Sequence, residues 1–128
     1  MANQYKGEIK GKLGDKERTF RLTFESIVNI ESRTGKSIME ISSDIAQNKF
    51  SFKDVLTILH EGLEATNNKL TVETVGDMIM KTGLSESAVI CANLVSTVFT
   101  GSDNAKEDDD SPLVKGENEQ KSTQSSNT

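Results

Sequence analysis

The chain opens on a run in which apolar and polar residues alternate. From Tyr5 to Leu13 every second residue is apolar or glycine, and lysines or a glutamate stand between them. A polar turn, residues 14–17, follows, and the alternation resumes from Arg18 to Leu22. Period-two alternation on both sides of a short polar turn predicts a β-hairpin with one apolar face. Two strands alone are marginally stable in water, so we expect this face to pack on the rest of the chain.

The hydrophobic spacing then changes from that of strands to that of helices. Thr23 is a favourable helix cap and Gly35 a favourable helix end, so the sequence predicts a first helix between them. Ser37 is expected to cap a second helix. Glu40, three residues further on, is expected to act as its capping-box partner.

Three more helices are predicted before Phe99. We expect Ser51 to cap the third helix, which runs to about Ala65. Thr71 is expected to cap the fourth helix and Gly83 to end it, and Ser85 is expected to open the fifth. Apolar residues at helical spacing predict which positions face the core. In chain order these are Phe24, Ile27, Val28 and Ile30; Ile38, Ile41 and Ile45; Phe52, Val55, Leu56, Leu59 and Leu63; Val72, Val75, Met78 and Ile79; and Ala88, Ala92, Val95 and Phe99, flanked by Cys91 and Val98.

These patterns predict an α+β domain over residues 1–101, an N-terminal β-hairpin packed on a bundle of about five short helices. Gly101 is expected to close it. Residues 102–128 hold seven acidic side chains against three lysines, and Leu113 and Val114 are their only sizeable apolar side chains. Such a segment cannot bury enough apolar surface to offset an ordering cost of about 1–2 kcal/mol per residue. We therefore expect a disordered acidic C-terminal tail.

Charge and cysteine content narrow the classes of function. The tail carries −4 of the net charge of −5, so the remainder is nearly neutral at −1. Binding to nucleic acid or to an anionic membrane surface needs a local surplus of lysine and arginine, and we expect neither. Cys91 is the only cysteine, so no internal disulfide can form, which fits a reducing cytoplasm. No apolar run is long enough to predict a secretory signal or a membrane span of about 20 residues.

Each feature that could carry chemistry has a simpler structural interpretation. Thr34–Ser37 ends like a phosphate-binding P-loop, but Ile30 stands where that motif needs a glycine. No motif supplies His60 with a nucleophile or an orienting carboxylate, and Cys91 lies in an apolar run where free cysteines pack as small hydrophobes. Asp108–Asp110 lacks the spaced oxygens of a calcium loop. We expect no catalytic, cofactor-binding or metal-binding residue, and the sequence leaves the partner-binding residues open.

The hairpin is the one ambiguous feature. Its apolar face is expected to cover the helices. A two-stranded sheet also has two open edges, and an open edge can accept a strand from a partner protein. The sequence therefore leaves strand addition as an alternative role for the hairpin.

Several short motifs occur in a characteristic order. They are Gly7-Glu8-Ile9, Arg21-Leu22-Thr23-Phe24, Glu31 with Thr34-Gly35-Lys36-Ser37, and the segments Phe52 to Leu63 and Leu70 to Ile79. In this order and spacing the chain resembles the tail assembly chaperone family of phages and gene transfer agents, which is also labelled tail tube protein. The resemblance covers roughly Met1 to Phe99 and leaves the tail uncovered.

The resemblance implies a non-enzymatic protein of the bacterial cytoplasm, without a cofactor, that works by protein–protein interaction. It would bind tail proteins, either tape-measure or tube subunits, and keep their apolar surfaces apart until the tail polymerises. One alternative is a structural tube or connector subunit of the particle itself. A second is a small helical DNA-binding regulator, although the third and fourth helices offer only Lys53 and Lys81 for a recognition surface. The oligomeric state stays open.

Overall fold

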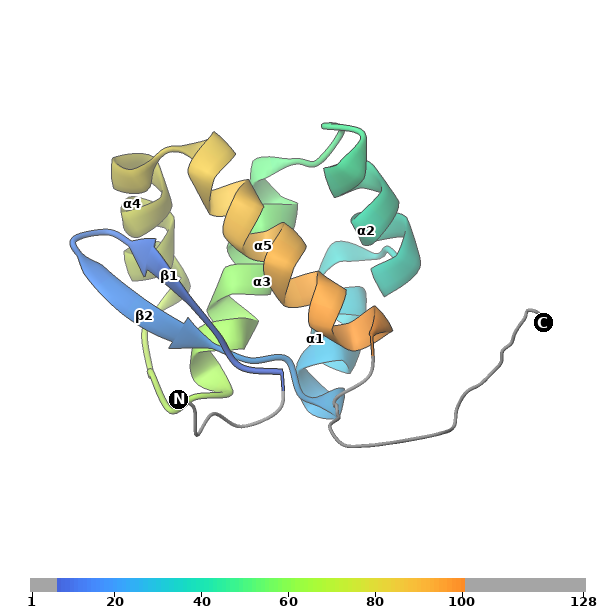
Figure 1. Cartoon of the computed structure of the whole chain (residues 1–128), viewed down its shortest axis with the longest axis horizontal. Helices are drawn as coiled ribbons and strands as arrows, with labels where there is room; N and C mark the ends of the chain where they lie inside the picture. Colours follow the sequence, from blue (N-terminus) through green and yellow to red (C-terminus); the bar gives the residue numbers. More distant parts are fainter. Residues whose placement is uncertain (1–6, 101–128) are drawn as a thin grey trace. The chain divides into compact units, whose positions relative to one another are not determined.

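A computed structural model describes residues 7–100 (Figure 1). The elements in chain order are β1 (Ile9–Leu13), β2 (Lys16–Phe20), α1 (Phe24–Thr34), α2 (Ile38–Ala46), α3 (Phe52–Glu64), α4 (Val72–Thr82) and α5 (Leu84–Phe99). The predicted α+β class, with an N-terminal hairpin and a bundle of short helices, is confirmed for this part of the chain. The predictions for Tyr5, for Gly101 and for the acidic tail, residues 102–128, fall outside the described residues.

The hairpin has a shorter turn than the sequence predicted. β1 and β2 pair antiparallel, with Ile9 opposite Phe20 and Leu13 opposite Lys16. Only Gly14 and Asp15 therefore connect the strands, and the prediction of a four-residue turn was wrong. Gly14 has φ 73°, a left-handed conformation that glycine adopts without steric cost. Such two-residue connections suit the right-handed twist of the paired strands.

The apolar face of the hairpin packs on the helices, as expected. Leu13 and Phe20 are fully buried. The tip of the hairpin is also tied to the end of α4, because the Gly14 backbone N–H donates a 2.7 Å hydrogen bond to Oγ1 of Thr82. The hairpin is thus part of the same core as the helices.

Four helices begin at the residues that the sequence predicted. In each, a side-chain oxygen of the cap accepts a hydrogen bond from the backbone N–H three residues further on. The caps and donors are Thr23 with Ser26, Ser37 with Glu40, Ser51 with Asp54, and Thr71 with Thr74. Gly35 ends α1 in the left-handed conformation, and Gly83 follows the last residue of α4.

Two details of the helix starts differ from the prediction. The reciprocal bond of a capping box forms at Ser26 in α1 and at Asp54 in α3, whereas Glu40 forms none in α2. A side chain of the preceding helix adds to the Ser37 cap there, because the Ile38 backbone N–H donates a 2.8 Å hydrogen bond to Glu31 Oε2. The fifth helix begins at Leu84, one residue before the predicted Ser85.

The core centres on α3, which contacts α1, α4, α5 and β2. Most predicted inward positions are buried there, and Ile58 of α3, which the predicted stripe omitted, is fully buried as well. The buried predicted residues are Ile30, Ile38, Ile41, Ile45, Val55, Leu59, Leu63, Val75, Ile79, Ala88, Cys91 and Val95; those packed at the margin of the core are Ile27, Phe52, Leu56 and Met78.

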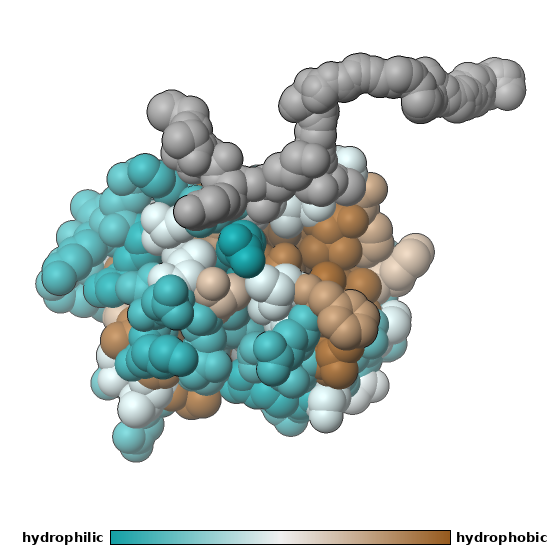
Figure 2. Space-filling view, turned by 90° about the horizontal axis from the view of Figure 1, so that it is seen from below, coloured by the Kyte–Doolittle hydropathy of each residue, from teal (hydrophilic) through white to brown (hydrophobic). Residues whose placement is uncertain are grey.

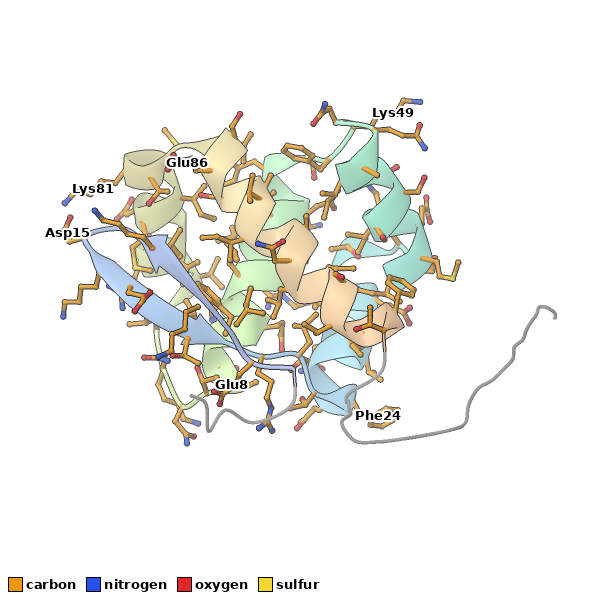
Figure 3. All side chains as sticks on the ribbon, viewed as in Figure 1. Glu8, Asp15, Phe24, Lys49, Lys81 and Glu86 are labelled. Atoms are coloured by element: carbon orange, nitrogen blue, oxygen red, sulfur yellow. The ribbon has the colours of Figure 1, made fainter. Side chains whose placement is uncertain are left out.

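Five predicted core residues are exposed instead. They are Phe24, Val28, Val72, Ala92 and Phe99. Phe24 is 84% exposed, and Figure 3 shows its ring pointing away from the helices. On the face drawn in Figure 2, apolar residues gather mostly on the right, while the left is mainly hydrophilic. The apolar residues of a peripheral helix can span a wider part of its surface than the part that is buried, because neighbouring elements cover such a helix on one side only.

The buried face of α5 differs from the predicted one for a related reason. α5 is contacted by α2, α3, α4 and β1, so its neighbours decide which side is covered. The covered side includes Ile90 and Leu94, whereas Ala92 faces outward. Ile90 lies against Gly11 of β1, where an added Cβ would stand 2.9 Å from Cγ1 of Ile90. A glycine in the strand therefore allows the hairpin to approach α5 closely.

Candidate functional site

The P-loop-like segment Thr34–Ser37 has a structural role. Nζ of Lys36 lies 3.0 Å from Oδ2 of Asp44 and 2.9 Å from Oδ2 of Asp54. Asp54 is buried and accepts a further hydrogen bond, at 3.2 Å, from the backbone N–H of Ser51. Lys36 thus joins the segment before α2 to the end of α2 and to the start of α3. Its amine is held by carboxylates.

The ion pairs of Lys36 make the free energy of unfolding depend on pH in the alkaline range. Hydrogen bonds to Asp54 and then to Asp44 raise the pKa of the Lys36 amine above its usual 10.5. A raised pKa means that the stabilisation is complete below pH 10.5 and is lost as pH rises through the folded-state value. Relative to a Lys36→Arg variant, which stays charged, the natural protein should lose unfolding free energy progressively above pH 10.5. Denaturant titrations along a pH series test this, and a constant difference between the two proteins would contradict it.

His60 lies at the margin of the core with both ring nitrogens engaged. Nε2 is 2.9 Å from the carbonyl oxygen of Leu70, and Nδ1 is 3.1 Å from Nη1 of Arg33. In the tautomer that fits both contacts, Nε2–H donates to Leu70 and Nδ1 accepts from Arg33. Glu64 lies further away, at 3.7 Å from Nε2. His60 is thus held by structural contacts between α1, α3 and the segment before α4.

Cys91 is fully buried in α5, with Sγ 3.7 Å from the carbonyl oxygen of Val55. Burial raises the pKa of the Cys91 thiol well above its usual 9.0, with a smaller contribution from the charge of Asp54. The thiolate, which is the nucleophilic form, is therefore disfavoured. The thiol packs here as a small hydrophobe.

Cys91 should consequently be unreactive in the folded protein. We expect a chromogenic disulfide reagent to label it only at the rate at which the domain opens, and to label it at once in guanidinium chloride. A matched control is the variant Cys91→Ala carrying Ala92→Cys, which places one thiol on the exposed side of the same helix. Fast labelling of the natural protein, comparable with that control, would show that the Cys91 site is accessible.

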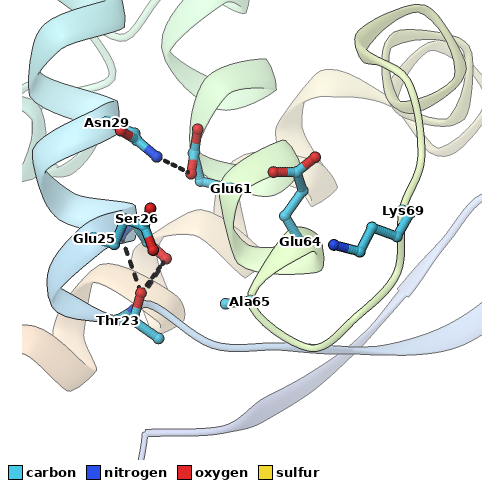
Figure 4. Close-up of a pocket in the computed structure, with 8 residues that line it drawn as sticks. All are labelled: Thr23, Glu25, Ser26, Asn29, Glu61, Glu64, Ala65 and Lys69. Atoms are coloured by element: carbon cyan, nitrogen blue, oxygen red, sulfur yellow. Dashed lines mark hydrogen bonds between the residues drawn. The ribbon is translucent and has the colours of Figure 1, made fainter.

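A polar hollow of about 250 Å³ lies between the start of α1 and the end of α3 (Figure 4). Its lining residues are Thr23, Glu25, Ser26, Asn29, Glu61, Glu64, Ala65 and Lys69. The hydroxyls of Thr23 and Ser26 are 2.8 Å apart and belong to the cap of α1. Glu61 accepts from Asn29 Nδ2 at 3.3 Å and from Arg33 Nη1 at 2.9 Å. These polar groups serve to hold α1 against α3.

The two edges of the hairpin differ. Beside β2, Oγ1 of Thr66 donates a 2.8 Å hydrogen bond to the carbonyl oxygen of Thr19, so the segment after α3 covers part of that edge. On β1, Lys10 and Lys12 are exposed. Lysines on an edge strand disfavour the addition of another strand. The alternative of strand addition stays a prediction, and the side chains on β1 do not favour it.

Residues 7–100 include no group of three or more His, Cys, Asp or Glu side chains arranged to hold a metal ion. No single helix among them has the length and apolar character to cross a membrane, although α4 and α5, bent by 115° at their junction, satisfy both criteria as a pair.

A groove lies between α2 and α5, formed by two adjoining hollows of about 300 and 280 Å³ that share Ile45 and Ala92. We call it the α2–α5 groove. Its lining is Ser42, Ile45, Ala46, Asn48, Phe50, Ser85, Ala88, Val89, Ala92, Val95, Ser96 and Phe99. The sequence prediction missed it. Small residues four positions apart, at Ser42 and Ala46 and at Ala88, Ala92 and Ser96, are the sequence signal that could have indicated it.

Comparison with known proteins places the chain in a family. Residues 6–101, three quarters of the chain, match the family model described as phage tail tube protein, GTA-gp10. No curated protein and no solved structure matches the chain. The match spans every helix and strand described above and confirms the resemblance to a tail family of phages and gene transfer agents. The chain therefore belongs to the phage tail tube protein, GTA-gp10, family.

Proposed function

We propose that this protein is a structural, non-enzymatic subunit of the tail of a phage-like particle or gene transfer agent. The observation that carries the proposal is the family match over residues 6–101, because that family is described as a tail tube protein. The match favours the tube or connector subunit, which was the alternative to the main prediction from the resemblance, over the tail assembly chaperone. It lends no support to a DNA-binding regulator.

The surface and the interior suit a subunit that works by contact. Large apolar side chains such as Phe24 and Val89 are exposed and available for burial against neighbouring proteins. The side chains with reactive potential, His60 and Cys91, are occupied by structural contacts. In this proposal the partners are other tail proteins, and the protein is located in the assembled particle.

Composition of purified particles tests the proposal. We expect quantitative mass spectrometry to find this chain in fixed proportion to other tail proteins. As a control, it should be absent from particles of a strain that lacks its gene and carries a complementing copy under repression. Capsids without tails provide a further control and should lack it. Absence from complete particles, together with co-purification with free tail subunits from cells, would overturn the proposal and support the chaperone.

We further propose that residues 1–101 form the folding unit. All the buried residues of the described part lie between Leu13 and Val95, so the unit contains a complete core. Deleting residues 102–128 should leave one cooperative thermal transition at nearly the same midpoint. Calorimetry compares the two chains, and loss of the transition would show that the deleted residues are needed for folding.

A further inference from the structure

Helix α1 buries fewer apolar side chains than any other helix of the described domain. Its buried residues are Ser26 and Ile30, so Ile30 is its one buried apolar side chain. Each of the other four helices buries two or more. The main neighbours of α1 are α3 and α2. Because hydrophobic burial is the dominant stabilising term in a folded domain, α1 is held less strongly by it than the other helices are.

Polar contacts join α1 to α3 instead. Oε1 of Glu61 accepts a 3.3 Å hydrogen bond from Nδ2 of Asn29 (Figure 4), and Oε2 accepts one of 2.9 Å from Nη1 of Arg33. The same Nη1 lies 3.1 Å from Nδ1 of His60. Only 8% of the Glu61 side chain and 31% of the Arg33 side chain are exposed. The attraction within such a pair is largely offset by the lost hydration of its charges, so its net stabilisation of the closed helix is small.

The same side of α3 also buries a hydroxyl group that has no partner. Thr57 is four residues before Glu61 and therefore lies on the same side of α3, the side that faces α1. Thr57 is 2% exposed, and its hydroxyl forms no hydrogen bond within residues 7–100. Burying a hydroxyl without a hydrogen bond is unfavourable, and water would satisfy it if α1 moved away from α3.

The chain is fastened to α3 on both sides of α1. Before the helix, the Arg21 backbone N–H donates a 3.1 Å hydrogen bond to the carbonyl oxygen of Gly62. After the helix, Nζ of Lys36 lies 2.9 Å from Oδ2 of Asp54. The next helix, α2, packs on α5. The hairpin and α2 therefore have contacts of their own that do not depend on α1.

We propose that α1 opens as a unit: it leaves α3 and exposes Thr57 and Glu61 to water, while the hairpin and α2 to α5 stay folded. Proteins open locally at a smaller free energy than global unfolding requires, and the elements that move in regulation come from such weakly held segments. A partner that binds the uncovered side of α3 would shift the population toward the open form. The inference goes beyond the proposed function and does not depend on it.

Amide hydrogen exchange of the full-length natural chain, followed by NMR, tests the proposal. We expect the amides of residues 28–33 to exchange at least about tenfold faster than the slowest amides of α3 and α5. Their rates should depend only weakly on low concentrations of denaturant, because opening one helix exposes little surface. The proposal is overturned if residues 28–33 exchange no faster than the slowest amides of α3 and α5.

Two substitutions on the contact between α1 and α3 should act in opposite directions. Thr57→Val keeps the shape and removes the unpartnered hydroxyl, so it should slow the exchange of residues 28–33 by about fivefold or more. Arg33→Met leaves the buried Glu61 without its cation and should accelerate that exchange by about tenfold or more. Lys53→Met removes the same charge from an exposed position of α3 and should leave the rates unchanged. Failure of Thr57→Val to slow the exchange would contradict the proposal.

Ile79→Val separates opening of α1 from global unfolding. Ile79 is fully buried in α4, whose main neighbours are α3, α5 and β1, so its contacts persist when α1 opens. This variant should accelerate the slowest amides of α3 and α5 by about two- to tenfold and leave residues 28–33 unchanged. Circular dichroism checks that each variant folds. Equal acceleration of residues 28–33 would show that α1 opens only when the whole domain unfolds.

Discussion

Replacing Phe20 by alanine should lower the free energy of unfolding by about 3–5 kcal/mol, the cost of truncating a fully buried phenylalanine. Phe20 is completely buried at the end of β2, where its Cβ is near Gly62 of α3. The ring therefore anchors the hairpin to the central helix. Because small domains are stable by only about 5–15 kcal/mol, this variant should lose a large part of its stability. Denaturant unfolding monitored by circular dichroism measures the change.

Phe24→Ala is the matched control for that prediction. It removes the same ring four residues later, from a side chain that is 84% exposed. Exposed substitutions usually change stability by no more than about 0.5 kcal/mol, so the two truncations should differ by several kcal/mol. Equal losses would mean that the hairpin does not pack on α3 as described. A large loss for Phe24→Ala alone, at concentrations where the protein is monomeric, would place Phe24 in the core.

The second large effect is expected at Gly62 of α3, where α3, α5 and β2 meet. A Cβ built there would stand 2.7 Å from Cδ2 of Leu94 and 3.4 Å from Cβ of Phe20. Leu94 and Phe20 are both fully buried, so neither can move into free space. Overpacking of this kind costs about 1–3 kcal/mol, and the better helix propensity of alanine returns at most about 1 kcal/mol. We expect Gly62→Ala to lower the free energy of unfolding by up to about 2 kcal/mol.

Gly76→Ala in α4 isolates the contribution of helix propensity. A Cβ at Gly76 would meet only Cδ1 of Leu56, at an ordinary contact distance of 3.9 Å. This substitution should therefore raise the free energy of unfolding by about 0.5–1 kcal/mol. The same chemical change is thus expected to have opposite signs in two helices. If Gly62→Ala also stabilises the protein, α3 and α5 do not approach as closely as the structure shows.

The sequence determined those features that depend on a few neighbouring residues. The caps Thr23, Ser37, Ser51 and Thr71 were predictable because a cap and its hydrogen-bond donor lie within four residues. The hairpin followed from its alternation in the same way. The structural role of Thr34–Ser37 was partly visible too, since a helix end and a cap explain Gly35 and Ser37. The partners of Lys36 were not, because Asp44 and Asp54 lie 8 and 18 residues away.

The expectation that the chain has no catalytic, cofactor-binding or metal-binding residue also came from the sequence. The family match favours a structural role but does not test individual residues. The candidate contact surfaces could not be predicted. The periodicity of α1 marks both Phe24 and Ile30 as apolar, yet Ile30 is fully buried and Phe24 is 84% exposed. Which one is covered depends on where α3 lies.

The amino-acid sequence by itself thus determined that the chain opens with a hairpin, where the first four helices begin, and which family the chain resembles, because local hydrogen bonds and spacing encode these properties. Only the tertiary structure decided which apolar residues form the core around α3 and which remain exposed, such as Phe24 and Val28 on α1, or line the α2–α5 groove. Burial is a property of elements brought together from distant parts of the chain. The groove exists only because α2 and α5, which are separated by two other helices in sequence, pack side by side.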